Sequence, residues 1–461
     1  MVAISHIINN GLLLTSQSVF QDVATPHQAA TEQYNLVKYL AGAGPYIQHP
    51  GFGISKDVPE QCTVEQVHLL SRHGERYPSK GKGKQFEELY AKFKGYDKPF
   101  VGELAFLNDY EYFVSDKEYY EKETSPKNSQ GLYAGTSDAF NHGTTFRSRY
   151  SELFEQSSEP LTLFTSNSGR CHVTARYFAR GLFGDEYSDD TADFAVIAEE
   201  DKFGANSLTP VVSCQNFHYS ASKDFVGAYN TDFLSATSAR ITEGNDFNLT
   251  EKETSRLVEW CAYEINVRGY SPFCNLFTND EFVKLSYGSD LSYYYGNGPG
   301  NNLTGTIGAP YLQATLDYLK EDNPPQKFVL AFTHDTNIEH FHAALGLLAP
   351  EDPLPNDHIP FPVPYAHTQI VPMGARLYTE KYKCGGESYV RFLVNDAVVP
   401  LQHCQDGPGF SCKLSDYEAY VQSRLEGKDY ASQCGAENVP EKVTFLWDYK
   451  TQNYSAPDID S

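Results

Sequence analysis

Residues 64–78 read VEQVHLLSRHGERYP, and this stretch decides the fold. It begins with a short apolar run, Val64 to Leu70, which leads directly into a polar loop that carries Arg72 and His73. A short apolar run bounded by such a loop is typical of a buried strand in a parallel sheet. The stretch therefore predicts a strand whose carboxyl end presents an arginine and a histidine.

Two later segments repeat this pattern. Residues 161–164 lead into a loop that contains Arg170, and residues 328–332 lead into His334 and Asp335. Apolar residues at helical spacing follow the Arg170 loop, so strand, loop and helix form an α/β unit. We therefore expect an α/β fold. A large domain has a mainly parallel central sheet flanked by helices, and a smaller α-helical domain is inserted into it.

The stretches between these strands are charged, rich in tyrosine and helical in pattern, most clearly over residues 251–268. Two apolar segments on either side of Gly385 and Gly386 predict an antiparallel hairpin at a sheet edge. The expected α/β domain is discontinuous and comprises residues 25–82, 156–215 and 300–461. The expected helical domain comprises residues 83–155 and 216–299.

Composition limits the partners and the location. The formal net charge of −24 disfavours nucleic acid, and no apolar run reaches the roughly 18 residues of a membrane span. The nine cysteines form no paired CxxC motif, so they indicate an oxidising, secreted location rather than a zinc site. Sequons for N-glycosylation, which agree with secretion, lie at Asn248, Asn302 and Asn453. Residues 1–24 are interpreted either as a leader that is removed or as an N-terminal arm.

The three strand ends bring together groups with one chemistry, because open α/β sheets bind ligands at the carboxyl ends of their strands. The converging residues are Arg72, His73, Arg76, Arg170, His334 and Asp335. Arginines match phosphate oxygens, a neutral imidazole can attack phosphorus, and a carboxylic acid can protonate a leaving alkoxide. Nearby guanidinium groups disfavour the imidazolium form of His73, so its imidazole stays nucleophilic in acid. Asp335 must be protonated to act as an acid, which also favours a low working pH.

Each of these features has a structural alternative. A lone Arg-His-Gly occurs by chance, Asp335 is also suited to starting a helix, and Arg170 alone can be a surface charge. Their joint occurrence at three strand ends favours the catalytic interpretation.

The run from Arg72 to Pro78 matches the RHGxRxP signature of the histidine acid phosphatases, and His334-Asp335 matches their second signature. The resemblance extends through most of the chain and is strongest to the yeast secreted phytases and acid phosphatases. It implies the phosphoglycerate mutase-like fold, a phosphohistidine at His73 and a proton donor at Asp335. It also implies that phosphate is held by Arg72, Arg76, Arg170 and His334.

The same resemblance implies four disulfide bonds and one free thiol. The implied pairs are Cys62–Cys384, Cys214–Cys434, Cys261–Cys274 and Cys404–Cys412. Cys171 is then unpaired and buried beside Arg170. Relatives in this group are often multimeric, so the resemblance also implies a homo-oligomer.

Residues beside the nucleophile suggest the substrate. Lys80, Lys82 and Lys84 alternate with glycines in an acidic protein, which predicts a flexible basic loop. Such a loop favours a small molecule with several phosphates, such as inositol hexakisphosphate (phytate). Ser79 and Asn337 are further candidates for substrate contacts. If the lysines form only a solvated surface loop, the function is that of a broad-specificity acid phosphatase.

Other classes of protein are disfavoured. No GxSxG elbow marks a serine hydrolase. A metal hydrolase would use His334, His340 and His342, but the last two are two apart on a predicted helix and point to different faces, so we expect neither metal nor cofactor. A secreted binding protein without activity would have lost a catalytic residue, whereas all six positions are filled.

Overall fold

The computed structural model describes residues 33–156 and 160–454. The predicted leader or arm, residues 1–24, lies outside these described residues. Within the described ranges, none of the helices combines the length and the apolar character that crossing a membrane requires.

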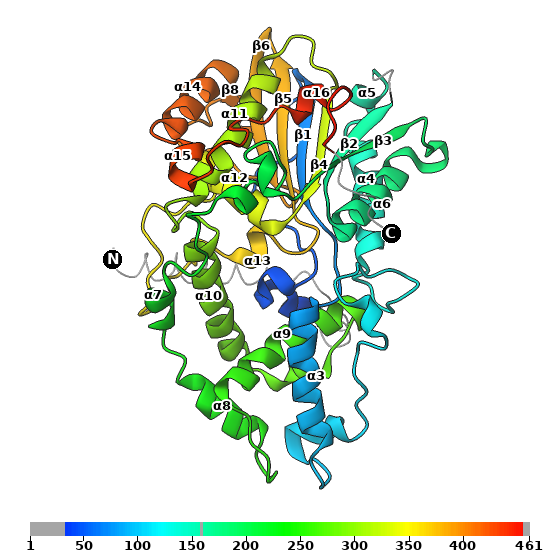
Figure 1. Cartoon of the computed structure of the whole chain (residues 1–461), viewed down its shortest axis with the longest axis vertical. Coiled ribbons are helices and arrows are strands. Elements are labelled where there is room, and N and C mark those ends of the chain that lie inside the picture. Colours follow the sequence, from blue (N-terminus) through cyan, green and yellow to red (C-terminus); the bar gives the residue numbers. More distant parts are fainter. Residues whose placement is uncertain (1–32, 157–159, 455–461) are drawn as a thin grey trace, which may run out of the picture.

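A mixed eight-stranded sheet forms the centre of the upper part of the molecule in Figure 1. Its strands are β1 (Cys62–Arg72), β2 (Leu161–Ser166), β3 (Ala192–Ile197), β4 (Phe328–Thr333), β5 (Arg376–Cys384), β6 (Glu387–Val394), β7 (Ala397–Val398) and β8 (Cys412–Lys413). Their order is β3-β2-β4-β1-β5-β6-β7, with β8 paired to β6. The first four strands in this order are parallel, and β5 and β6 form the predicted antiparallel hairpin. The three strands predicted from apolar runs are therefore adjacent.

Helices cover both faces of this sheet. The α-helices are α3 (Lys80–Lys94), α4 (Gly135–Arg149), α5 (Ser151–Phe154), α6 (Gly169–Phe183), α7 (Lys223–Gly227), α8 (Phe233–Ile241), α9 (Glu251–Arg268), α10 (Asn279–Gly296), α11 (Thr304–Lys320), α12 (Asp335–Leu345), α13 (His367–Ile370), α14 (Leu414–Leu425), α15 (Tyr430–Cys434) and α16 (Phe445–Asp448). In β4, Leu330 and Phe332 pack with α4 and α6, whereas Val329 and Ala331 pack with α11, α12 and α14. Because both faces are covered, every residue of β4 is buried, which explains its continuous apolar run.

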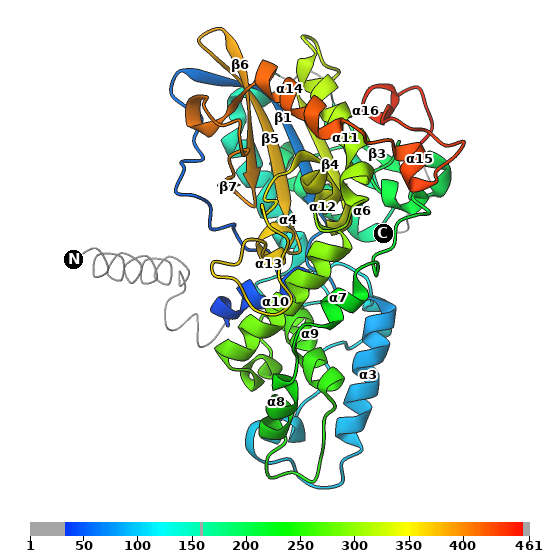
Figure 2. The same cartoon turned by 90° about the vertical axis from the view of Figure 1, so that its left-hand side faces the viewer.

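A helical part made of α3, α8, α9 and α10 lies beyond the lower end of the sheet (Figures 1 and 2). Its core surrounds Trp260, which is fully buried and donates its indole N–H to the Tyr110 hydroxyl over 2.9 Å. The predicted helix 251–268 is confirmed as α9, which starts at a capping box of Thr250 and Glu253.

The division into two domains stays a prediction. Helix α4 and the short α5 belong to the stretch 83–155 that was assigned to the helical domain. Phe146 of α4 and Leu153 of α5 nevertheless pack in one cluster with strands β1, β2 and β4. These two helices therefore cover the sheet.

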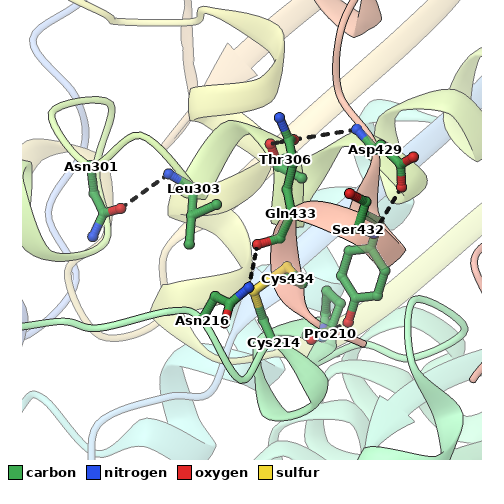
Figure 3. The surroundings of a disulfide bond; sticks show 11 residues. Pro210, Cys214, Asn216, Asn301, Leu303, Thr306, Asp429, Ser432, Gln433 and Cys434 are labelled. Atoms are coloured by element: carbon green, nitrogen blue, oxygen red, sulfur yellow. Dashed lines mark hydrogen bonds between the residues drawn. A yellow bond between two sulfur atoms is a disulfide. The ribbon is translucent and has the colours of Figure 1, made fainter. Parts of the chain in front are cut away.

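The structure contains four disulfides, two of which join distant parts of the chain, and all four predicted pairs are confirmed. Cys62–Cys384 links the paired ends of β1 and β5, and Cys214–Cys434 ties α15 to the segment after Pro210. Around the latter bond, Figure 3 shows the Asn216 side chain, which donates to the carbonyl oxygen of Gln433 over 3.0 Å. Cys171 is free and buried, as predicted.

Candidate active site

The register of the parallel strands aligns three strand ends. Arg72 of β1 is paired with Thr333 of β4, and Thr165 of β2 is paired with Phe332 of β4. The loop after β1 continues this pairing, because the backbone N–H of His73 donates to the Thr333 carbonyl over 3.0 Å. The loops that follow β1, β2 and β4 therefore meet at the edge of the sheet that faces the helical part (Figure 1).

His73 is buried and held with one nitrogen available. Its Nδ1 lies 2.8 Å from the carbonyl oxygen of Gly74, and since a carbonyl only accepts, Nδ1 must donate. The proton is then on Nδ1, and Nε2 keeps its lone pair. Burial lowers the pKa of His73 well below its usual value, and Arg170, Arg72 and Arg76 lower it further. The geometry thus produces a neutral imidazole, which the sequence predicted.

Three guanidinium groups surround this imidazole. Arg72 is anchored by the carbonyl oxygens of Gly42 at 2.8 Å and Val371 at 2.6 Å. The Nε atoms of Arg72, Arg76 and Arg170 are all buried, and none has a hydrogen-bond partner among the described residues. Buried donors are normally paired, so three such donors mark a site for an anion with several acceptor oxygens.

His334 completes the cationic set with a partner that sequence reasoning missed. The rings of His73 and His334 are 5.9 Å apart, and Arg170 Nη2 lies 3.3 Å from His334 Nδ1. Glu199, which follows β3, places its Oε1 at 2.6 Å from His334 Nε2. Burial lowers the pKa of His334, but Cys171 and Glu199 raise it, to about 10. His334 is therefore cationic and turns Nδ1 towards the arginines.

Asp335 is the first residue of α12 and is paired with Arg72. Its Oδ2 lies 2.9 Å from Arg72 Nη2, and its Oδ1 accepts from the Thr336 N–H at 2.9 Å. Burial raises the pKa of Asp335, but Arg72, followed by His367 and His334, lowers it to about 2. Without a bound ligand, the ion pair with Arg72 keeps Asp335 ionised, so low pH by itself does not supply the proton that its predicted role needs. An anionic ligand that pairs with Arg72 in place of Asp335 removes this lowering of the Asp335 pKa.

The three lysines do not form a flexible loop, which corrects the sequence-based expectation. Helix α3 begins at Lys80, because Ser79 caps it by accepting from the Lys82 N–H over 3.3 Å. Lys82 is paired with both carboxylate oxygens of Glu259 at 2.7 Å, whereas Lys80 and Lys84 are exposed. Only these two lysines present an unpaired charge among the three.

Asn337 lies two residues beyond Asp335 in α12. It is 2% exposed, and its Nδ2 has no hydrogen-bond partner among the described residues. It therefore remains a candidate donor near the site. Within residues 33–156 and 160–454, no group of three or more His, Cys, Asp or Glu side chains is placed to hold a metal ion.

Comparison with known proteins gives a consistent picture. The model of the histidine phosphatase superfamily, branch 2, matches residues 63–395. A phytase of Candida albicans is 54% identical over 460 residues, which are 99% of each chain. An acid phosphatase of Saccharomyces cerevisiae is 40% identical over 433 residues, or 92% of each chain. The crystal structure of a phytase from D. castellii is 53% identical, with a TM-score of 0.91 over 96% of this chain and 97% of the other.

Proposed function

The chain belongs to branch 2 of the histidine phosphatase superfamily and is a phosphomonoester hydrolase, and we propose that His73 is its nucleophile and Asp335 its proton donor. The observation that carries this proposal is the neutral imidazole of His73 among three arginines with buried, unpaired Nε atoms. A phosphoryl group bound by these arginines and by His334 faces the free Nε2 of His73.

In the proposed reaction, the bond between phosphorus and His73 Nε2 forms as the bond to the alcohol oxygen breaks. The departing oxygen takes a proton from Asp335. This proton comes with the substrate, because a phosphate monoester, whose second pKa is about 6, is a monoanion in acid. Its oxygens pair with the arginines, and its proton passes to the Asp335 carboxylate. Water then attacks phosphorus, and the bond to His73 Nε2 breaks as the new oxygen–phosphorus bond forms. The proton that this water loses goes to Asp335, which passes it to the released phosphate and is again a carboxylate.

We propose phytate as the preferred substrate, in line with the phytases at 54% and 53% identity. The excess of cationic groups at the site suits a ligand with several phosphates. A broad-specificity acid phosphatase is the second candidate, because acid phosphatases match at 40% identity. Release of phosphate from phytate and from p-nitrophenyl phosphate distinguishes the two functions. If the protein is a phytase, its kcat/KM at about pH 4–5 is higher on phytate than on p-nitrophenyl phosphate.

The exposed lysines at the start of α3 provide a sharper test of phytate preference. We expect Lys80→Ala/Lys84→Ala to lower kcat/KM on phytate about three- to tenfold and to change it less than about twofold on the aryl phosphate. The physical reason is that the arginines bind one phosphate of phytate, and the negative charges of its other phosphates attract the exposed lysines. Steady-state kinetics at low ionic strength measure the effect, and added salt should reduce it.

Two lysines elsewhere provide a matched control. Lys98 and Lys252 are also exposed, and Lys98→Ala/Lys252→Ala changes the net charge by the same amount. If this control lowers kcat/KM on phytate as much as the α3 variant does, the lysines of α3 do not bind substrate.

We further propose that the protein acts outside the cell. Four disulfides suit an oxidising compartment. The sequon residues Asn248, Asn302 and Asn453 are exposed, as glycosylation requires. Assembly into a homo-oligomer stays a prediction.

A further inference from the structure

Behind the nucleophile loop lies a pair of buried carboxyl groups that the reaction does not use. Glu75 is 1% exposed and Glu123 is 5% exposed, and each has one carboxyl oxygen without a hydrogen-bond partner among the described residues. Arg76 and Glu123 form an antiparallel bridge, and the Thr124 N–H donates to the Glu75 carbonyl over 2.8 Å. The segment around Glu123 is therefore attached directly to the loop that carries His73.

Thr174 of α6 connects Glu123 to this loop. Its hydroxyl oxygen accepts from the Gly74 N–H at 2.9 Å, lies 2.9 Å from the Arg170 carbonyl oxygen, and lies 3.1 Å from Glu123 Oε2. Gly74 packs directly on Glu123, because a Cβ added to Gly74 would come within 2.4 Å of Glu123 Oε1. One hydroxyl thus contacts the backbones of both the nucleophile loop and a phosphate-binding residue.

The surroundings of Glu123 favour a carboxyl group that carries a proton. A threonine hydroxyl has one hydrogen to donate and two lone pairs to accept with. If Glu123 is ionised, its charge is buried with the Thr174 hydroxyl as its one donor among the described residues, and its Oε1 has no partner at all. If Glu123 is protonated, it donates to Thr174, and Thr174 donates to the Arg170 carbonyl. The Gly74 N–H then fills the second lone pair.

The electrostatic surroundings also favour the proton. Burial raises the pKa of Glu123 well above its usual value despite its bond to Thr174, and Glu75 adds to the rise. Burial raises the pKa of Glu75 to about 8. The titratable groups that face the pair from neighbouring elements are Asp138 of α4, Cys171 of α6 and Arg376 of β5, and the backbone N–H of Tyr46 donates to Glu75 Oε1 over 2.7 Å. Arg376 is the one cation in this set, and it is shared with Asp138 and Asp396 at 3.4 and 3.7 Å.

We propose that Glu123 is a positioning residue whose protonated form holds Thr174, and through it Gly74 and Arg170, in the arrangement that the nucleophile needs. This inference rests on the proposed role of His73. It adds a reason for acid operation that lies in the enzyme itself, separate from the protonation of the substrate. Folding raises the pKa values of Glu75 and Glu123. Their contribution to the stability of the folded arrangement is therefore complete below the pKa of glutamate in the unfolded chain, about 4.3. It is lost as the pH rises through the folded values, near 8 for Glu75.

The test is the pH profile of kcat for Glu123→Gln. The amide can donate to Thr174 but cannot ionise, so we expect kcat within about twofold of the parent near pH 5. Between pH 5 and about pH 7.5, kcat of the parent should fall more steeply than kcat of the variant. The ratio of variant kcat to parent kcat should therefore rise at least about threefold over this range. The protonation of the substrate affects both proteins equally and cancels in their ratio.

Glu264→Gln is the matched control, because Glu264 is also buried and its pKa is raised by burial to about 7. It lies in the helical part, where it pairs with Arg268 at 2.7 Å, and its loss should leave the pH profile of kcat unchanged. A second pair of variants tests the relay itself. Thr174→Val should lower kcat about tenfold or more at every pH, and Thr174→Ser should restore it.

Parallel pH profiles for Glu123→Gln and its parent would overturn the inference, as would a folded Glu123→Gln variant that is inactive near pH 5. If Glu123→Gln does not fold, the Thr174 variants decide, and a Thr174→Val enzyme as active as its parent refutes the relay. Failure of the proposed function looks different. In that case His73→Ala, measured alongside, retains the activity of the parent.

Discussion

Replacing His73 with alanine is expected to lower kcat by at least about 10⁴-fold on every phosphate ester, because the atom that bonds to phosphorus is removed. The arginines and His334 remain, so the variant should still bind inorganic phosphate. Stopped assays of phosphate release measure the loss, and competition by inorganic phosphate in a binding assay measures the retained site. A large loss of kcat together with retained phosphate binding would show that the variant still forms the phosphate site and has lost only the chemical step.

His172 provides the control for this variant. It lies two residues beyond Arg170 on α6, and its ring packs against Phe194 of β3, with ring centroids 5.6 Å apart. His172→Ala should keep kcat within about threefold of the parent. A His73→Ala protein with native circular dichroism and undiminished phosphate release contradicts the assignment of the nucleophile.

Asp335→Asn should have an effect that depends on the leaving group. On phytate, whose alkoxide must be protonated as it departs, we expect kcat/KM to fall about 10²- to 10⁴-fold. On p-nitrophenyl phosphate, whose phenolate departs without a proton, the fall should be about tenfold or less. The two substrates measured on one preparation provide their own control for folding and concentration.

The same variant should bind phosphate at least as tightly as the parent. Asp335 now holds Arg72 through an ion pair of 2.9 Å, which a bound phosphate must displace. Arg72 keeps its two bonds to the carbonyl oxygens of Gly42 and Val371, so it stays in place. An equal loss of kcat/KM on both substrates would show that Asp335 serves binding rather than proton donation.

The strands that could be predicted from the sequence are those that are buried on both faces of the sheet, because such burial produces a run of apolar residues. Strand β4 is almost entirely apolar, and β1 and β2 contain shorter apolar runs, because helices cover both faces of these strands. Strand β3 was missed because it forms the edge of the sheet, and its run is broken by the exposed Asp193. Glu199 follows this strand, so the partner of His334 was missed with it.

Other parts of the site depend on contacts between distant residues. The glycines around Lys82 suggested a loop, but Gly83 lies in α3 because it packs against Tyr120, where a Cβ would come within 2.3 Å of the ring. The ionised state of Asp335 follows from Arg72, which is 263 positions away in the sequence but adjacent in space. No local pattern encodes such pairings, and only the six residues at the three strand ends could be placed in advance.

The central claim is that phosphorus bonds transiently to His73, and the most direct test is a rapid-quench experiment on Asp335→Asn with a labelled aryl phosphate. Formation of the phosphoenzyme needs no acid with this substrate, whereas its hydrolysis loses the base that Asp335 provides, so the intermediate should accumulate. We predict label that survives alkali, is lost in acid and maps to the peptide containing His73. An enzyme that turns over under these conditions and carries no label on His73 would contradict the account.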